Sequence, residues 1–344
     1  MLVSFIVVAL NAGDKLNVLL KDLQRQDYVH CKIEVILVDS HSRDNTKEVM
    51  RGFAASNHDF SRVVVLDNPK KTLPCGWNIA LKESRGDVIL RVDAHSSIPK
   101  DFVRKNVEAL ENGENIVGGH RISVIDDDSP WQRTLLIAET SVFGSGIATY
   151  RRSKQKKHVK TLAHAAYRRK VFQSVGGYDE RLARTEDNEI HYRMRKAGFR
   201  FLLDPSIKSF HHARNKLPKM LKQKFMNGKW IGLTLGVAPK CFSVYHLVPF
   251  FFILALIACF TLHLLGISAP MMTLLLVYFI TNVLNTAIAV RGNRRHFSYV
   301  LLPVIFFLLH VAYGTGTLFG VLELPFWLRK HPKPFTDIFS LGGS

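Results

Sequence analysis

Two aspartates stand where apolar segments of the sequence end, a position that suits the binding of a polar ligand. Asp39 follows the apolar run at residues 33–38, and Asp93 follows the run at 88–92. Short runs rich in Val, Ile and Leu predict buried parallel strands. Because ligands of open α/β sheets bind beyond the carboxyl ends of the strands, we expect both carboxylates at one binding edge. The alternative for Asp39 is to cap the helix that begins near Asp44.

Strand-like runs and helical patterns alternate through the first part of the chain. Strands are predicted at 2–10, 33–38, 63–66 and 88–92, with helices at 15–25, 44–55 and 77–83. This order predicts an α/β fold, a Rossmann-like and mostly parallel sheet with right-handed crossovers. The run at 2–10 lacks a preceding basic segment, so we expect a buried strand there rather than a signal peptide. The absence of Gly-x-Gly-x-x-Gly and P-loop motifs excludes standard dinucleotide and Walker-type sites.

Charge is unevenly distributed along the 344 residues of the chain. Lys and Arg number 47 against 28 Asp and Glu, a formal net charge of +19. Residues 1–240 hold 41 basic and 26 acidic side chains, whereas residues 241–344 hold only 6 and 2. A mean hydropathy of +0.06 excludes an intrinsically disordered chain. The four cysteines show neither metal-ligand spacing nor disulfide density, as is typical of a reducing, cytosol-facing location.

The second part of the chain has the composition of a membrane region. Residues 241–290 contain no Asp, Glu, Lys or Arg, and a spanning helix needs about 20 apolar residues. Within a transmembrane region at 241–328 we expect α-helical spans near 245–265, 270–290 and 298–322. Three glycines in the last run favour a re-entrant segment as an alternative there: Gly314, Gly316 and Gly320. A buried helical hairpin of a soluble protein is the alternative to the first two spans.

Basic residues predict which side of the membrane each part faces. Arg291, Arg294 and Arg295 lie in the short loop after the second run, and loops rich in arginine face the cytoplasm. We therefore expect residues 1–240 in the cytoplasm. Three spans would place the basic tail at 329–344 outside, against the same rule, and the sequence leaves this conflict open.

Two segments of the first part are strongly basic. Residues 151–170 hold nine basic side chains and residues 205–240 hold eight, without an acid in either. Such runs bind either nucleic-acid phosphates or anionic lipid. Because apolar residues are interleaved with lysines at 216–230, we predict a basic amphipathic helix at the membrane interface, within a segment at 213–240. Membrane lipid is therefore the expected partner, and nucleic acid is not.

Five motifs in a fixed order give the sequence a resemblance to a known family. They are VVALNAGDKL, EVILVDSHSRDNT, GWNIALKESRGDVILRVDAHSSIP, HAAYRRKVFQSVGGYDE and RTEDNEIHYRMRKAGFR. In this order they resemble the family 2 glycosyltransferases, and within them the membrane-anchored subgroup that includes the succinoglycan glucosyltransferases. The resemblance covers roughly residues 1–235. It implies a GT-A fold in a domain at 1–212, an inverting mechanism, a nucleotide-diphosphate sugar donor and Mg²⁺ or Mn²⁺.

The resemblance assigns four residues to the nucleotide-sugar site besides Asp93. Asp39 matches the aspartate that hydrogen-bonds the nucleotide base, and Ala9 and Asn11 belong to the loop beside it. Asn78, in the motif that begins at Gly76, is expected to contact the donor as well.

The same resemblance predicts a metal site. Asp93-Ala94-His95 stands where the family has Asp-x-Asp, whose acids hold the metal that neutralises the departing diphosphate. Because His95 replaces the second acid, it either ligates the metal through nitrogen, which favours Mn²⁺ over Mg²⁺, or hydrogen-bonds a phosphate oxygen. His211 is a further candidate ligand, since it precedes Arg214 where the family often has an aromatic residue or His before Arg. A structural role is the alternative for His211.

Thr185-Glu186-Asp187 matches a motif of the family's acceptor side. The resemblance marks Asp187 as the base that takes the proton of the acceptor hydroxyl, with Glu186 beside it. Both acids also suit the first turn of a predicted helix at 188–197, and capping is compatible with catalysis. Lys229 and Trp230 only partly match the acceptor-side Gln-x-x-Arg-Trp motif of processive members, which argues against a processive enzyme.

The sequence thus predicts a membrane-anchored inverting glycosyltransferase, a multi-pass protein of a bacterial cell membrane with a cytoplasmic catalytic domain. We expect it to transfer one sugar from a UDP-linked donor to a lipid-linked saccharide, in the synthesis of exopolysaccharide, capsule or a related glycan. One rival is a processive polysaccharide synthase. The other is a catalytically silent membrane protein that binds nucleotide or nucleic acid.

Overall fold

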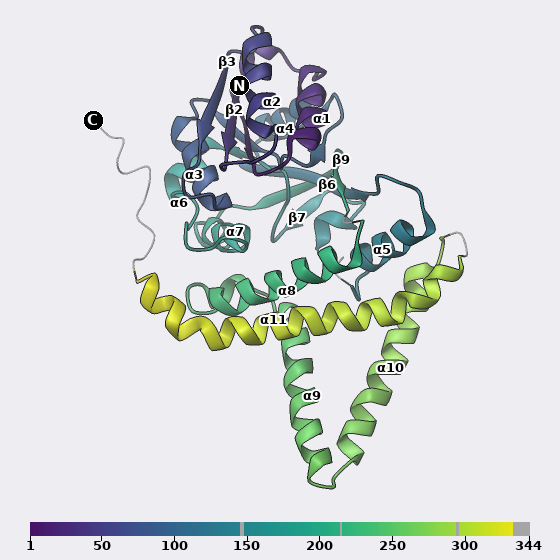
Figure 1. Cartoon of the computed structure of the whole chain (residues 1–344). Helices are drawn as coiled ribbons and strands as arrows, with labels where there is room; N and C mark the ends of the chain where they lie inside the picture. The colour runs from purple at the N-terminus through teal and green to yellow at the C-terminus, as the bar shows by residue number, and fades with distance from the viewer. Residues whose placement is uncertain (145–147, 214, 294–295, 333–344) are drawn as a thin grey trace. The chain divides into compact units, whose positions relative to one another are not determined.

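The computed structural model describes residues 1–144, 148–213, 215–293 and 296–332, and these fall into two compact units (Figure 1). The first unit comprises Met1–Ile122 and Thr149–His212, and the second comprises Ser123–Ala148 and Ala213–Pro332. The domain predicted at 1–212 includes Ser123–Ala148, whereas the structure groups this segment with the C-terminal helices. Arg214, Arg294, Arg295 and residues 333–344 of the predicted basic tail lie outside the described residues.

The first unit is built on a mixed sheet. Nine strands pair within the described residues, in the order β3 (Arg62–Asp67), β2 (Ile33–Asp39), β1 (Val3–Ala9), β4 (Val88–Arg91), β8 (Ala166–Arg168), β6 (Ile116–Val124), β9 (Phe201–His212) and β5 (Ser96–Ser97), with β7 (Lys157–Val159) beside β9. The parallel part joins β3, β2, β1 and β4 and aligns Ala9 with Asp39. This part confirms the predicted α/β fold.

Pairing becomes antiparallel beyond β4. Strand β8 pairs with β4 and β6, and β9 pairs with β5 and β7. Strands β5 to β9 are absent from the sequence-based expectations. Strands β5, β7 and β8 have only two or three residues each, too few for a periodic pattern. Strands β6 and β9 are longer, and their conformation depends on partners far away in the chain.

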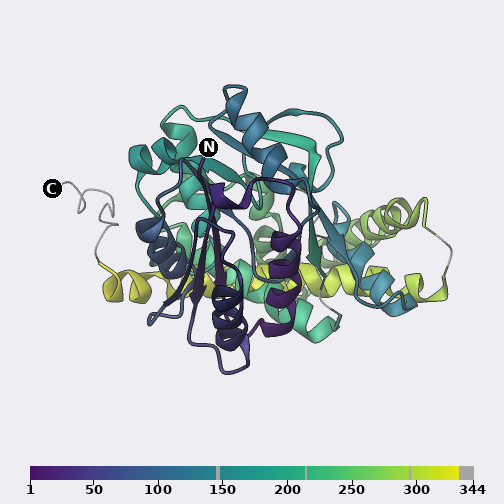
Figure 2. The ribbon, with the colours of Figure 1, turned by 90° about the horizontal axis from the view of Figure 1, so that it is seen from above.

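Helices cover both faces of the central strands. Alternate residues of β1 point to opposite faces: Phe5 belongs to a core with α1 (Gly13–Gln24) and α4 (Phe102–Glu111), whereas Ile6 belongs to a core with α3 (Leu73–Glu83) and α7 (Glu186–Lys196). Figures 1 and 2 both show these strands between α1 and α3. Every residue of β1 is buried and all but Ser4 are apolar, as expected of a strand covered on both faces, which confirms the buried strand predicted at 2–10.

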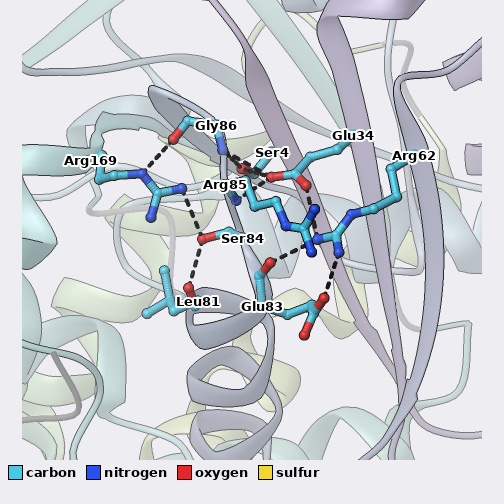
Figure 3. A network of polar contacts seen from close by, with 9 residues as sticks. All are labelled: Ser4, Glu34, Arg62, Leu81, Glu83, Ser84, Arg85, Gly86 and Arg169. Atoms are coloured by element: carbon cyan, nitrogen blue, oxygen red, sulfur yellow. Dashed lines mark hydrogen bonds and ion pairs between the residues drawn. The ribbon is translucent and has the colours of Figure 1, made fainter. Parts of the chain in front are cut away.

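A network of buried hydrogen bonds connects the amino-terminal ends of β1, β2 and β3 (Figure 3). The carboxylate of Glu34 accepts hydrogen bonds from the hydroxyl of Ser4 at 2.5 Å and from the amide of Gly86 at 2.9 Å. Arg62 donates to its other oxygen at 3.0 Å. Glu34 therefore ties β2 to its neighbours at one edge of the sheet, while Asp39 ends the same strand at the opposite edge.

The second unit is helical. It contains α5 (Pro130–Thr140), α8 (Leu217–Thr234), α9 (Val248–Leu264), α10 (Ala269–Val290) and α11 (Leu302–Lys330). Leu135 and Ala138 of α5 are buried in one core with Leu302, Ile305 and Phe306 of α11. This shared core is the physical reason why Ser123–Ala148 belongs to the second unit.

Helix α11 runs without a break over 29 residues, so the re-entrant segment suggested by its glycines is wrong. Gly316 and Gly320 allow close packing against α8 instead, and Gly314 allows close packing against Pro249 of α9. A Cβ atom on Gly316 would lie 2.1 Å from the carbonyl oxygen of Phe225, and one on Gly320 would lie 2.1 Å from that of Lys229. Figure 1 shows α8 alongside α11, with α9 and α10 as a hairpin that projects away from the pair.

Two helices of the described part are long and apolar enough to cross a membrane, Ala269–Val290 and Phe297–Lys330. The third apolar helix, α9, has 17 residues, at the lower limit of the range of about 17–25 residues that can span a bilayer. Only 6% of the most apolar window of α10 is buried, compared with 33% for Phe297–Lys330. The hairpin also exposes large apolar side chains, among them Phe251, Ile257, Phe260, Leu276 and Phe279. This exposure argues against the soluble hairpin and fits membrane anchoring.

Candidate active site

The loops that follow β1 and β2 meet at the carboxyl edge of the sheet. The amide of Ser40 donates to the carbonyl of Ala9 at 2.9 Å, and the amide of Arg43 donates to the side chain of Asn11 at 2.8 Å. Asn11 adopts a left-handed backbone conformation with φ of 50°, which asparagine tolerates better than most residues. The predicted nucleotide-binding residues on β1 and β2 are therefore brought together.

Asp39 is buried at this edge, with 2% of its surface exposed. The amide of Ser42 lies 3.3 Å from both of its carboxylate oxygens. The helix that follows, α2 (Thr46–Ser56), has Asn45 as its N-cap residue, and the amide of Thr46 donates to Asp44 at 3.1 Å. A contact between Asp39 and a nucleotide base stays a prediction.

Asn78 is buried and hydrogen-bonds a loop of its own unit. Its side-chain nitrogen donates to the carbonyl of Tyr178 at 2.9 Å, and its side-chain oxygen accepts the amide of Tyr178 at 2.8 Å. Both ends of the amide thus hold one backbone segment. A direct contact of Asn78 with the donor stays a prediction.

Asp93 is held by a histidine from a distant segment. His164 Nε2 lies 3.2 Å from Asp93 Oδ2, and His164 Nδ1 lies 2.9 Å from the hydroxyl of Ser209. Burial by itself would raise the pKa of Asp93, but the His164 bond and the nearby Arg91 charge hold that pKa well below its usual range. Asp93 is therefore an ionised, oriented carboxylate.

Two further imidazoles lie beside this carboxylate. The rings of His95 and His211 meet edge to face, with centroids 5.3 Å apart. His211 Nδ1 is buried and has no hydrogen-bond partner among the described residues. Burial and the charge of Arg121 lower the pKa of His211, so its ring is neutral and its nitrogen lone pair is available.

Asp93, His95 and His211 carry the kinds of donor atom that bind a divalent metal. One carboxylate and two imidazoles suit Mn²⁺ and the later first-row metals better than Mg²⁺. Among the described residues, no group of three acid, histidine or cysteine side chains is already gathered closely enough to hold an ion. The unpaired His211 Nδ1 is the observation that favours a ligand there, and the metal stays a prediction.

Asp187 forms a bidentate ion pair with Arg91. Arg91 Nη1 donates to Asp187 Oδ1, and Arg91 Nη2 donates to Asp187 Oδ2 at 3.1 Å. The guanidinium lies over two aromatic rings, 4.5 Å from the centre of Trp77 and 5.5 Å from that of Tyr178. The Arg91 side chain is 9% exposed, whereas that of Asp187 is 39% exposed and accessible to a substrate.

Glu186 and Asp187 differ in environment although they are neighbours in the first turn of α7. The side chain of Glu186 is 4% exposed, and its Oε2 atom has no partner among the described residues. Burial, together with the charge of Asp187, raises the pKa of Glu186 well above its usual value. Burial thus disfavours the charged form of Glu186, and its acceptor-side role stays a prediction.

Lys229 and Trp230 lie in the second unit, on α8. Lys229 Nζ forms an ion pair of 2.6 Å with Glu323, and the ring of Trp230 meets that of Trp327 with centroids 6.3 Å apart. Both side chains thus contact α11. Their expected role on the acceptor side stays a prediction.

Three residues that surround the candidate acids have no assigned role in the sequence analysis: Arg91, His164 and Tyr178. All three lie inside the quoted motifs, and Arg91 precedes the Asp93 motif by two positions. A charged residue at the end of an apolar strand is the one local signal that marks Arg91. Their partners are separated from them by up to 100 residues, a relationship that no local pattern contains.

The mixed α/β sheet, with acids at the carboxyl ends of its parallel strands, has the GT-A architecture of glycosyltransferases. The sequence profile of the family described as glycosyl transferase family 2 matches residues 4–176. The chain belongs to this family, which confirms the resemblance found in the motifs.

Two curated relatives illustrate the membership. The succinoglycan biosynthesis protein ExoA of Rhizobium meliloti (strain 1021) is 30% identical over 227 residues, which cover 65% of this chain and 67% of ExoA. The dolichyl N-acetyl-α-D-glucosaminyl phosphate 3-β-D-2,3-diacetamido-2,3-dideoxy-β-D-glucuronosyltransferase of Methanococcus voltae is 24% identical over 327 residues, 93% of this chain and 97% of the relative.

Solved structures share the fold. The mannosyltransferase PcManGT from Pyrobaculum calidifontis, in complex with GDP-Man and Mn²⁺, has a TM-score of 0.58 at 16% identity and covers 92% of this chain and 87% of its own. S. aureus TarS 1-349 in complex with UDP-GlcNAc has a TM-score of 0.51 at 14% identity, with 98% and 93% covered. At these identities the likeness shows the fold alone.

Proposed function

We propose that this family 2 glycosyltransferase is a membrane-anchored inverting enzyme that transfers one sugar from a UDP-linked donor to a lipid-linked acceptor. The observation that carries the proposal is the cluster of Asp93, Arg91 and Asp187. The guanidinium of Arg91 lies 3.9 Å from Asp93, in the candidate diphosphate site, and pairs with Asp187, the candidate base. A catalytically silent protein would have no need of such a cluster.

The donor side of the reaction belongs to the loops after β1, β2 and β4. Asp39 would accept a hydrogen bond from the base, and Asn11 and Ala9 would line the pocket beside it. The complex of TarS with UDP-GlcNAc supports a UDP-sugar, whereas that of PcManGT with GDP-Man makes a GDP-sugar the alternative.

Asp93, His95 and His211 would hold a divalent metal, with Mn²⁺ preferred. When bound, the metal would neutralise the charge that develops on the departing nucleotide diphosphate. The complex of PcManGT with Mn²⁺ supports this assignment, as does the buried, unpaired Nδ1 atom of His211.

The acceptor side belongs to Asp187. An inverting displacement forms the bond from the acceptor oxygen to the anomeric carbon while the bond to the diphosphate breaks. The half-exposed carboxylate of Asp187 would take the acceptor's hydroxyl proton during this step. The single base also fits an enzyme that needs no covalent sugar intermediate.

A lipid-linked acceptor is supported by the names of the relatives. One acts on a dolichyl-phosphate-linked sugar, and another belongs to succinoglycan biosynthesis. A lipid-linked acceptor requires an enzyme at a membrane surface, and the exposed apolar hairpin α9–α10 would supply the anchor. We place this enzyme in exopolysaccharide, capsule or related glycan synthesis at a bacterial membrane.

The packing of α11 against α8 supports a specific disposition in that membrane. We place α9 and α10 across the bilayer as the two spans and α11 along its cytoplasmic surface with α8. Arg291, Arg329 and Lys330 would then all lie on the cytoplasmic side, so the positive-inside rule would be obeyed throughout. The third span of the sequence analysis would be replaced by a surface helix.

Sugar release from a panel of UDP- and GDP-linked donors tests the proposal. The full chain in detergent should release sugar from one UDP-linked donor and transfer it once to a lipid-phosphate-linked saccharide. Products of many added sugars would favour a processive synthase. Binding of donor without any release would favour the silent protein.

A further inference from the structure

The carboxylate that we propose as the base is held by a buried arginine, Arg91. Arg91 directs both terminal nitrogens of its guanidinium at the two oxygens of Asp187. Such a bidentate pair fixes the plane of the carboxylate as well as its position. Each carboxylate oxygen has two acceptor sites, so each keeps one that can receive a proton.

The guanidinium is itself held in place. It lies over the faces of Trp77 and Tyr178, and Arg91 Nη1 is 3.2 Å from the hydroxyl of Tyr178. The backbone of Tyr178 is in turn fixed on both sides by the side chain of Asn78, at 2.8 and 2.9 Å. A continuous series of contacts therefore runs from Asn78 through Tyr178 and Arg91 to Asp187.

The charges around Arg91 favour the same pairing. Glu186 Oε1 lies 3.9 Å from Arg91 Nη2, farther than the 3.1 Å to Asp187 Oδ2, and burial disfavours the charged form of Glu186. Asp93 Oδ1 is also 3.9 Å away and is engaged by His164 through its other oxygen. Asp187 is thus the carboxylate that directly neutralises the buried Arg91 charge.

We propose that Arg91 is a positioning residue that acts on transfer through Asp187, by holding its carboxylate where the acceptor hydroxyl must be deprotonated. The inference rests on the proposed function, because it needs Asp187 to be the base. A displacement of about 1 Å of a catalytic group costs on the order of a hundredfold in rate. Loss of the clamp should therefore resemble loss of the base.

A double-mutant cycle between Arg91→Met and Asp187→Asn tests this inference on the full chain in detergent. Each single variant should lower kcat for transfer by about a hundredfold, while the KM for the donor changes less than about threefold. In the Asp187→Asn background, Arg91→Met should change kcat by less than about threefold, because a residue that acts through Asp187 has nothing left to position.

Two further variants separate positioning from a general structural effect. Arg91→Lys keeps the positive charge but loses the paired N–H donors of the guanidinium. Its kcat should therefore be little higher than that of Arg91→Met. Arg168→Met removes a half-buried arginine whose side chain donates to the carbonyls of Glu114 and Leu110, at 3.1 and 2.7 Å, rather than to a candidate site residue. It should lower the melting temperature with little effect on kcat.

Independent effects of Arg91→Met and Asp187→Asn, which multiply in the double variant, would overturn the inference and indicate a direct contact of Arg91 with substrate. Full kcat in Arg91→Lys would overturn it as well, since charge alone would then suffice. If Asp187→Asn itself turns over like the wild type, the proposed base is wrong. If Arg91→Met turns over like the wild type while Asp187→Asn does not, Asp187 is still the base but Arg91 does not position it.

Discussion

His164 Nε2 lies 3.2 Å from Asp93 Oδ2, although 71 residues separate the two side chains in the sequence. His164 is 4% exposed and adopts a left-handed backbone conformation with φ of 48°. Such a conformation costs energy in a residue other than glycine and persists where surrounding contacts impose it. The pairing gives the candidate metal ligand a partner that fixes its orientation.

His164→Ala should therefore weaken metal activation. Partners of a metal-ligating side chain typically contribute 10- to 100-fold to metal affinity or activity, so the Mn²⁺ concentration for half-maximal transfer should rise by about that factor. Titration of the apoenzyme with Mn²⁺ measures it. His120→Gln, which removes a histidine bonded to the carbonyl of Arg151 at 2.6 Å, is the matched control. Unchanged Mn²⁺ dependence in His164→Ala would show that Asp93 needs no such support.

Asp187→Asn should separate donor binding from transfer. A lost general base costs about a hundredfold or more in rate, whereas the affinity for the nucleotide should hardly change because Asp187 lies on the acceptor side. Isothermal titration with UDP and a transfer assay measure the two quantities. Glu189→Gln serves as the control, since Glu189 lies on the same helix but pairs with Arg193 at 2.6 Å. Equal turnover in wild type and Asp187→Asn would remove Asp187 from the mechanism.

Metal identity should depend on His95. A chelator should abolish transfer, and Mn²⁺ should restore it better than Mg²⁺. His95→Asp should shift the preference toward Mg²⁺, because it restores a site whose ligands are oxygens. The ratio of Mn²⁺- to Mg²⁺-supported rates in the two proteins is the measurement. Full activity in excess chelator would contradict the metal assignment altogether.

The exposed lysines of α8 should matter for the lipid-linked acceptor but not for anchoring. Each lysine near an anionic surface contributes about 1 kcal/mol of attraction. Replacing Lys216, Lys219 and Lys222 together by Gln should therefore weaken transfer to a lipid-linked acceptor in anionic vesicles, while hydrolysis of the donor by water is much less affected. The protein should stay in the membrane fraction, since the hairpin α9–α10 is unchanged.

The control for this variant makes the same change of charge on the first unit, at the exposed Lys82, Lys100 and Lys170. It should leave transfer to vesicle-borne acceptor near the wild-type rate. Equal loss of donor hydrolysis and lipid transfer in the α8 variant would mean that the helix supports catalysis structurally, and the membrane-surface assignment would then be wrong.

Acid should destabilise the sheet through Glu34 (Figure 3). Burial alone would raise its pKa, but bonds from Ser4, Arg85 and Gly86 and the charge of Arg62 outweigh this and lower it. A carboxyl whose pKa is lower in the folded state stabilises the fold above its unfolded value of about 4.3, and this stability is lost as pH falls through the folded value.

The melting temperature of the detergent-solubilised chain should thus fall between about pH 5 and pH 3. Glu34→Gln should be less stable at pH 7 but lose less on acidification, because the amide carries no charge to titrate. An identical acid-induced fall in wild type and Glu34→Gln would show that Glu34 does not contribute to it.

Local patterns in the sequence determined the elements whose signal lies within a few residues. The apolar runs predicted β1, β2, β3 and β4, and the order of strands and helices predicted the parallel part of the sheet. The strand-end position of Asp39 and Asp93 also placed both at one edge, because parallel strands leave their carboxyl ends together. Apolar length alone located α9 and α10.

Only the tertiary structure decided which side chains meet around these acids. Arg91 and Asp187 are 96 residues apart, and His164 reaches Asp93 only because β8 pairs with β4. The glycines of α11 also show that a local pattern does not decide a long-range contact. Their spacing is compatible with a broken helix or with a close helix pair, and the choice depends on the backbone of α8, which the residues of α11 do not encode. Contacts between distant residues depend on how the whole chain folds. A short stretch of sequence can therefore identify possible site residues, but it cannot identify the distant residues that contact them.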